Sequence, residues 1–295
     1  MHPKRTDKIA TGIIYAVVAT VVAILVFLIG YILYNGVPDI TWHFLTSQAQ
    51  SFSAGGGIRD QLFNSLYLLL LTLIISFPIA MGAGIYLAEY AKDNWITDII
   101  RTSIEVLSSL PSVVVGLFGY LLLVNQLNMG FSILSGAIAL TFFNLPLLTR
   151  NIEESLNSVP NLQKEAGISL GLSDWKTITK IIVPEGLPGI LTGVILSSGR
   201  VFGEAAALIY TAGQSAPSVS YTNWNIFNAN SFLNPMRPAE TLAVHIWKVN
   251  TEAVTPDAHA ISSGSSAVLI IVILIFNLGA RFIGNHIYKK MTAAK

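Results

Sequence analysis

Long stretches without a charged residue set the first limit on what this chain can fold into. The longest, from Val106 to Thr149, contains no Asp, Glu, Lys, Arg or His. A membrane span needs only about 20 apolar residues to cross roughly 30 Å of hydrocarbon. Charged residues are 11% of the 295 residues, against about 25% in an average soluble protein. So little charge cannot cover a water-facing surface, so the sequence predicts a membrane protein and excludes a soluble enzyme or a disordered regulator.

Six apolar segments are long enough to span. The polar turn from Asn125 to Gly130 divides the long stretch in two. These runs are apolar on all sides, which excludes the alternating strands of a β-barrel. The first run is about 25 residues long, more than the 7–15 of a signal peptide, so we expect an uncleaved anchor. The prediction is an all-α membrane protein, a single transmembrane domain over 1–295, with spans at about 9–33, 62–87, 106–124, 131–149, 187–210 and 262–285.

The distribution of basic residues sets the orientation. Of the 17 Lys and Arg residues, thirteen fall on one side of the predicted layout, three on the other, and Arg200 falls within a span. Basic residues concentrate in cytoplasmic loops. Both termini are therefore expected to be cytoplasmic. Two connections are long, a cytoplasmic elbow at 161–184 and an outside loop at 211–261, and long loops in compact proteins usually carry function.

The cytoplasmic elbow reads as two short helices around a glycine. Gly171 stands where a left-handed residue closes the first helix. Ser173 suits the N-cap of a second helix, which Pro184 ends. A helix–glycine–helix elbow is a suitable handle for a soluble partner, and an ordinary amphipathic connector on the membrane is the alternative.

The elbow resembles the EAA motif of ATP-binding-cassette (ABC) importer permeases. That pattern is E-A-A, three residues, G, nine residues, I, one residue, L-P. Here Gly167 replaces the second Ala and Val183 replaces Leu. The resemblance implies the type I ABC importer permease fold, with the first helix of the elbow as the coupling helix that docks on a separate ATPase dimer. The coupling residues are Glu165, Ala166, Gly167, Gly171, Ile181 and Pro184.

No catalytic machinery accompanies this motif. The chain lacks the phosphate-binding G-x-x-x-x-G-K-[ST] loop, so any ATP is used by the partner ATPase. Ser173 and Lys176 fit S-x-x-K, but the other motifs of that enzyme class are missing. Cysteine is absent, and the five histidines lack metal-ligand spacing. We expect no enzyme activity, no metal and no cofactor bound by this chain.

The fifth span carries Arg200 and Glu204 among small residues. A charge deep in a span costs about 2.5–3.5 kcal/mol on insertion scales, so Arg200 should face the bundle interior. Residues four apart on a helix can pair. One hypothesis is a structural ion pair; the other is that Arg200 meets an anionic solute in the path and Glu204 holds it when the path is empty. Small residues at this spacing predict close helix packing, at Gly189, Gly193, Gly199 and Gly203.

The segment Gly199–Ala206 is similar to the G-R-x-x-G-E-[TA]-A segment of phosphate importer permeases, and Pro238–Trp247 resembles a string that this family carries before its last span. The outside string and the short N-terminal lead favour the PstA-type over the PstC-type permease. The resemblance implies phosphate import across a prokaryotic cell membrane, with a sister permease, an ATPase dimer and an external phosphate-binding protein as partners.

Two alternatives stay open for the cargo and the energy source. One is an ABC importer for sulfate or molybdate, because Arg200 suits any oxyanion. The other is an anion channel or secondary transporter that uses no ATP. Among the remaining polar residues of the spans, Asn64 and Asn144 could line a path or bond a neighbouring helix.

Overall fold

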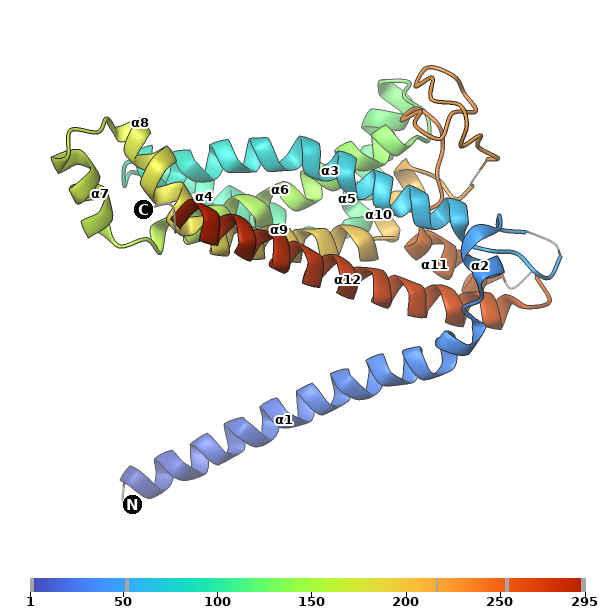
Figure 1. Cartoon of the computed structure of the whole chain (residues 1–295), viewed down its shortest axis with the longest axis horizontal. Helices are drawn as coiled ribbons and strands as arrows, with labels where there is room; N and C mark the ends of the chain where they lie inside the picture. The colour runs from blue at the N-terminus through green and yellow to red at the C-terminus, as the bar shows by residue number, and fades with distance from the viewer. Residues whose placement is uncertain (1–2, 51–52, 216, 253–254, 293–295) are drawn as a thin grey trace.

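The computed structural model describes residues 3–50, 53–215, 217–252 and 255–292, and they form a bundle of helices (Figure 1). An isolated bridge joins Ser220 and Ser231, and the described residues contain no strand. The predicted all-α fold is therefore confirmed. The helices are α1 (Pro3–Gly36), α2 (Trp42–Thr46), α3 (Arg59–Ile85), α4 (Trp95–Ser108), α5 (Ser112–Gly119), α6 (Ile133–Asn157), α7 (Asn161–Ser169), α8 (Asp174–Thr177), α9 (Val183–Gly203), α10 (Ala206–Thr211), α11 (Leu242–Glu252) and α12 (Ala258–Thr292).

Five helical segments of the described chain are long and apolar enough to cross a membrane, and the bent pair of α4 and the helix after it can supply a sixth. The α7–α8 hairpin lies at one end of the bundle, which we call the hairpin end (Figure 1). The irregular segments 212–215 and 217–241 lie at the opposite end, the loop end (Figure 1). The start of α1 and the end of α12 both point toward the hairpin end (Figure 1). This agrees with the prediction that both termini lie on the same side of the membrane.

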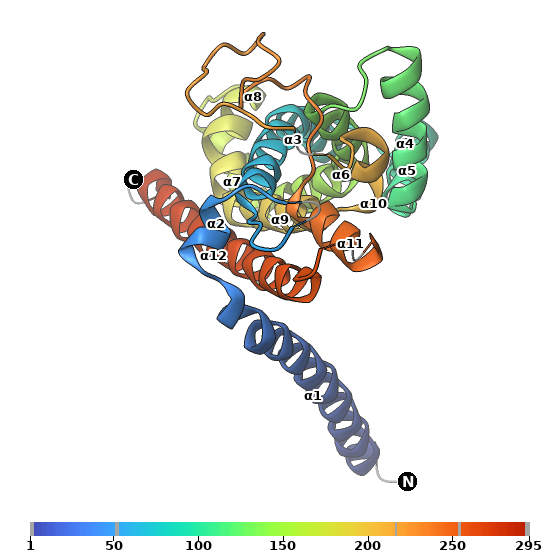
Figure 2. The same ribbon diagram turned by 90° about the vertical axis from the view of Figure 1, so that its right-hand side faces the viewer.

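Helix α1 stands apart from the rest of the molecule (Figure 2). It meets the body at its last turn, where Gly36 packs against Ser263 and Ala267 of α12. Its apolar side chains from Ile9 to Tyr31 are exposed. An apolar helix without a partner on any side is suited to lipid or to another membrane chain.

Helix α6 is the centre of the bundle and packs against both α3 and α9. A Cβ added at Gly189 would lie 2.5 Å from Ser155 Oγ, and one at Gly193 would lie 2.8 Å from Asn151 Cβ. These two glycines therefore let α9 approach α6 closely. A Cβ added at Gly199 or Gly203 would meet no atom within 4 Å. The packing predicted for these last two is thus not made within the described chain.

The predicted third span, 106–124, is not one straight helix. Helix α4 and the segment Ser112–Gln126 are bent by 95°. The bend falls at Pro111, which has no N–H to continue the helix and disfavours helical backbone in the residue before it. Beyond α5 the chain continues as a π-helical turn, Tyr120–Gln126.

The predicted fifth span, 187–210, also differs. Helix α9 ends at Gly203, Glu204 takes extended backbone (φ −76°, ψ 124°), and α10 starts at Ala206. At its other end α9 follows α8 through a π-helical turn, Ile178–Ile182, without a break. Pro184 therefore does not end the second elbow helix. It lies in the first turn of α9, directly after the π-helical turn.

The predicted outside loop, 211–261, contains the regular helix α11 and the start of α12. Its residues 216, 253 and 254 lie outside the described residues, as do 1–2 and 293–295 at the termini. The irregular part is fastened to the bundle by backbone hydrogen bonds. Ile133 N–H donates to Arg237 O at 3.0 Å and Leu134 N–H to Pro235 O at 2.8 Å. The loop is thus fixed directly on the first turn of α6.

Candidate functional site

Arg200 lies near the loop end of α9 and is half-buried. Its guanidinium carbon lies 3.6 Å from the centroid of the Phe143 ring on α6. A guanidinium over an aromatic face is attracted by the ring's electron density, by about 0.5–2 kcal/mol depending on desolvation. The ring thus holds the cation inside the bundle through its flat face, and the N–H groups at the edge of the guanidinium are left to donate.

The expected ion pair between Arg200 and Glu204 is not formed. No ion pair within 4 Å involves Arg200 in the described part of the chain. The four-residue spacing fails because α9 ends at Gly203, before Glu204. The Glu204 carboxylate instead accepts the Ala207 N–H at 3.1 Å and caps the first turn of α10. A carboxylate suits this place, because the N-terminal end of a helix favours negative charge.

The side of α9 next to Arg200 is open. Thr192, Leu196 and Gly203 are exposed, and Gly199 has no neighbour at the position of a side chain. Small residues here leave room beside a cation that has free donors. A solute no larger than an oxyanion would therefore meet little steric resistance at Arg200 within this chain.

On the α6 side, Asn144 follows Phe143 and is completely buried. Neither its amide nitrogen nor its amide oxygen has a hydrogen-bond partner in the described protein. Ser197 of α9 is also buried, with an unpartnered hydroxyl. Leaving a buried polar group without a partner costs about 1–3 kcal/mol. Both side chains are closed off from solvent, so neither lines an open path in this structure.

The α7–α8 hairpin has the local structure that its sequence predicts. Gly171 is left-handed (φ +79°), and Leu172 N–H donates to Gly167 O at 3.2 Å, which is the hydrogen-bond pattern of a glycine-terminated helix. Ser173 Oγ accepts the Lys176 N–H at 3.4 Å, so it is the N-cap of α8. A Cβ at Gly167 would lie 2.7 Å from Ile181 Cδ1 and 2.9 Å from Thr177 Cγ2. The small residue therefore sets how closely the two arms approach.

Three of the six coupling residues face solvent. Glu165 and Ala166 are exposed, and so are the apolar side chains of Leu162 (76%) and Leu170 (82%). Ile181 and Pro184 instead lie inside the hairpin and at the base of α9. Exposed leucines on a charged, well-capped helix are typical of a surface that another protein covers. The structure brings the motif together as one hairpin.

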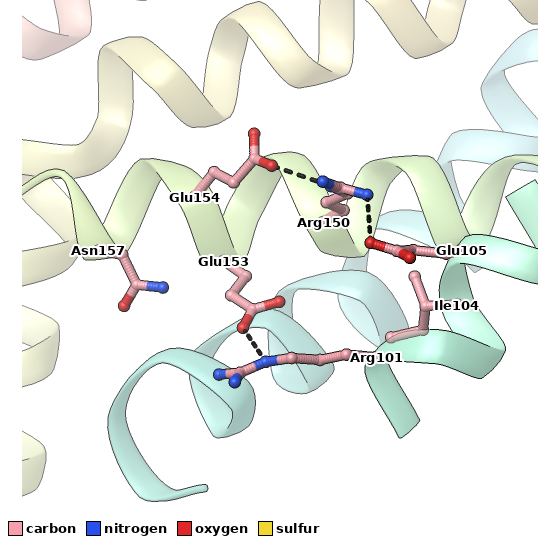
Figure 3. Close-up of a pocket in the computed structure, with 7 residues that line it drawn as sticks. All are labelled: Arg101, Ile104, Glu105, Arg150, Glu153, Glu154 and Asn157. Carbon is pink, nitrogen blue, oxygen red and sulfur yellow. Dashed lines mark hydrogen bonds and ion pairs between the residues drawn. The ribbon is translucent and has the colours of Figure 1, made fainter. Parts of the chain in front are cut away.

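A cluster of ion pairs lies beside the hairpin end, between α4 and α6, and lines a pocket of about 320 Å³ (Figure 3). Arg101 Nε is 3.0 Å from Glu153 Oε1, and Arg150 Nη1 is 3.0 Å from Glu105 Oε1. Arg150 also pairs with Glu154 at 2.9 Å. All these charges are paired with each other, so the cluster fastens α4 to α6.

A second polar cluster, at the loop end, has no counterpart in the sequence predictions. The buried Arg237 donates to Asn64 Oδ1 at 2.7 Å and to Phe232 O at 3.2 Å, and burial lowers its pKa. Asn64 Nδ2 donates to Glu240 O at 3.0 Å. Asn64 therefore bonds the loop segment and does not line a path.

Glu240 is the centre of that second cluster. Its side chain is buried, accepts from Gln61 Nε2 at 2.9 Å, and lies 3.2 Å from His245 Nδ1 and 3.7 Å from Lys248 Nζ. Burial would raise the pKa of this carboxyl, but the contacts with His245, Gln61 and Lys248 outweigh it, and the pKa is lowered. Glu240 is thus a carboxylate that joins α3 to the start of α11.

The fold is that of the membrane permease of a type I ABC importer. A solved structure of a bacterial alginate ABC transporter, in complex with an alginate pentasaccharide-bound periplasmic protein, is similar with a TM-score of 0.66. The alignment covers 96% of this chain and 98% of that one at 15% identity. Residues 80–293 match the family described as the binding-protein-dependent transport system inner membrane component, and the chain belongs to that family.

Relatives in sequence agree with this assignment. The probable ABC transporter permease protein YqgI of Bacillus subtilis is 54% identical over 99% of this chain and 100% of its own length. The phosphate transport system permease protein PstA of Xylella fastidiosa is 32% identical over 84% of this chain and 81% of its own length. The predicted PstA-type resemblance is confirmed. The chain is the permease subunit of an ABC importer, a multi-pass membrane protein whose ATPase is another subunit.

Proposed function

We propose that this permease moves inorganic phosphate inward across the cell membrane, with the hairpin end in the cytoplasm. The observation that carries the proposal is Arg200, held over Phe143 beside the open glycines of α9 and free of any carboxylate within 4 Å in the described chain. A planar guanidinium donates several hydrogen bonds to one oxyanion. The naming of 30–36% identical relatives as phosphate permeases supports phosphate among the oxyanions.

The position of Glu204 gives Arg200 a different role from the one expected of an ion pair. Its carboxylate accepts the Ala207 N–H and caps α10. The cation therefore has no salt bridge that an arriving anion must break, although the charge of Glu204 still acts on it. Its ring partner Phe143 contacts the flat face of the guanidinium, so the N–H groups at the edge stay available to an anion.

The remaining parts of the complex follow from the surfaces. The exposed motif on α7 docks in an ATPase subunit, and a dimer of that subunit hydrolyses ATP; this chain binds no nucleotide. The free helix α1 adjoins a sister permease. The fixed loop 212–241 receives an external phosphate-binding protein. Phosphate is released on the cytoplasmic side when ATP-driven movement of α7 tilts α9.

Sulfate and molybdate remain the competing cargoes, because the geometry at Arg200 suits any tetrahedral oxyanion. The relative named YqgI has no stated substrate, so the family does not decide between them. A channel or secondary transporter is disfavoured, because an exposed, capped coupling hairpin has no use in a chain that works without an ATPase.

The experiment is uptake of radiolabelled phosphate by phosphate-starved cells that lack the chain, with and without its restoration. Excess sulfate and molybdate are added as competitors. We expect restored uptake that neither competitor reduces, and its loss in Arg200→Ala with the complex still assembled. Normal uptake by an assembled Arg200→Ala complex would refute the role of Arg200. If the chain is inserted in the membrane and uptake is not restored, phosphate is not the cargo.

A further inference from the structure

The coupling helix α7 touches the bundle at two places. Through Gly167 it packs against its own hairpin partner, the segment that runs without a break into α9. At the other place Lys164 Nζ lies 2.6 Å from Glu89 Oε2. Glu89 belongs to a π-helical turn, Tyr86–Tyr90, that ends α3. Lys164 immediately precedes the coupling motif, so this contact starts on the helix that the ATPase would move.

The Lys164–Glu89 pair is better sheltered than an ordinary surface ion pair. The Glu89 side chain is 8% exposed and the Lys164 side chain 36%. Exposed pairs are weak because water and salt screen them. Screening is reduced where one partner is buried, so this contact can carry force between α7 and α3.

The same π-helical turn is held from its other side by α4. Arg101 Nη2 donates to Leu87 O at 3.5 Å, while its Nε pairs with Glu153 of α6 at 3.0 Å (Figure 3). A continuous series of polar contacts therefore leads from α7 through the end of α3 to α4 and α6. Helix α6 carries Phe143, the residue on which Arg200 rests. π-Helical turns are wider than α-helical ones and are common at functional sites.

We propose that Lys164 and Glu89 form a second arm of the coupling device. The covalent arm runs from α7 through α8 to α9 and Arg200; the ionic arm runs from Lys164 through Glu89 to α3, and from there to α6. Because Arg200 and Phe143 lie on different arms, both arms must move together for the two residues to stay in contact. Without the ionic arm, ATP hydrolysis would pull α9 while α3 and α6 stay behind. This inference rests on the proposed docking of an ATPase on α7.

The test uses the whole complex in lipid vesicles and two readouts. The first is phosphate moved per ATP hydrolysed. The second does not depend on the cargo: Gly203→Cys supplies the single cysteine of a chain that has none, and its labelling by a polar maleimide is compared with and without ATP. The variants are Glu89→Gln, Lys164→Met and the charge exchange Glu89→Lys with Lys164→Glu. Lys176→Met is the control, since this exposed lysine of the same hairpin makes no side-chain ion pair in the described chain.

Each single change should lower the transport-to-hydrolysis ratio about fivefold and remove the effect of ATP on labelling, while hydrolysis stays near normal. The exchanged pair should restore both, and the control should change neither. Unchanged ATP-dependent labelling in Glu89→Gln would overturn the inference. Equal loss of assembly, hydrolysis and transport would also overturn it, because the pair would then only stabilise the fold. The inference would likewise fail if ATP did not change the labelling of the complex without these substitutions. ATP-dependent labelling without phosphate uptake in that complex would instead reject the cargo alone.

Discussion

The guanidinium of Arg200 rests 3.6 Å above the ring of Phe143, and each residue comes from a different helix. This contact holds a cation inside an apolar bundle without a neutralising carboxylate. It also joins α9, which is continuous with the coupling hairpin, to α6, the central helix. The residue that would meet the solute and the residue that positions it are thus moved by different elements.

Replacing Phe143 should weaken transport without removing the cation. Phe143→Leu keeps an apolar side chain but takes away about 0.5–2 kcal/mol of cation–π attraction, so the guanidinium samples more orientations and half-saturation should rise roughly two- to thirtyfold. Uptake measured against phosphate concentration in vesicles checks this. Phe142→Leu is the matched control, because Phe142 is 59% exposed on the same helix. Equal effects of the two changes would contradict the role of the ring.

The glycines of α9 should divide into two classes. An added methyl at Gly193 would come within 2.8 Å of Asn151 Cβ, whereas at Gly199 it would meet nothing within 4 Å. Gly193→Ala should therefore destabilise the chain by about 1–3 kcal/mol, and Gly199→Ala should leave its stability unchanged. Thermal unfolding of the detergent-purified complex measures both. Destabilisation by Gly199→Ala would mean that another surface packs there.

The fold class and the hairpin could be predicted from the sequence because their causes are local. A left-handed glycine at Gly171 and an N-cap at Ser173 depend on a few neighbouring residues, and apolar length alone locates a span. The predicted ion pair of Arg200 with Glu204 was wrong, because a four-residue spacing brings two side chains together only where both residues lie in the same helix. Helix α9 ends at Gly203, before Glu204. Where α9 ends depends on Glu204 finding the Ala207 N–H.

The clusters at the two ends could not be predicted, because their partners are distant in sequence. Asn64 and Arg237 come together only when the loop lies on α6. Lys164 and Glu89 come together only when the α7–α8 hairpin lies beside the end of α3. The bend between α4 and α5 could be predicted only in part. Pro111 predicts a kink, but its size depends on the ion pairs that hold α4 on α6.

Residue 167 should tolerate one methyl group but no branched side chain. A Cβ there would press on the far end of Ile181, which can rotate away, and on Thr177 Cγ2. Gly167→Ala should therefore keep the hairpin closed, while Gly167→Leu should force its arms apart. Co-purification of the ATPase subunit measures the difference. We expect full recovery with alanine and loss with leucine, and equal recovery would contradict the packing argument.

The Glu240 cluster should make stability depend on acid. Contacts with His245, Gln61 and Lys248 lower the pKa of Glu240 against the opposing effect of burial. A carboxyl whose pKa is lowered by folding contributes its full stabilisation above the unfolded pKa, about 4.3, and loses it as the pH falls through the lower, folded value. The unfolding temperature of the purified complex should therefore drop as the pH falls below about 4.3.

Glu240→Gln isolates the contribution of that carboxylate. At pH 7 the free energy of unfolding of this variant should be lower by about 1–3 kcal/mol, because Lys248 and His245 keep their donors but lose a charged acceptor. Below about pH 4 the difference from the unaltered chain should shrink, since protonation removes the same charge. Glu252→Gln, on the exposed end of α11, should follow the unaltered chain at every pH. A constant difference between Glu240→Gln and the unaltered chain would show that the carboxylate stabilises the loop end by shape and not by charge.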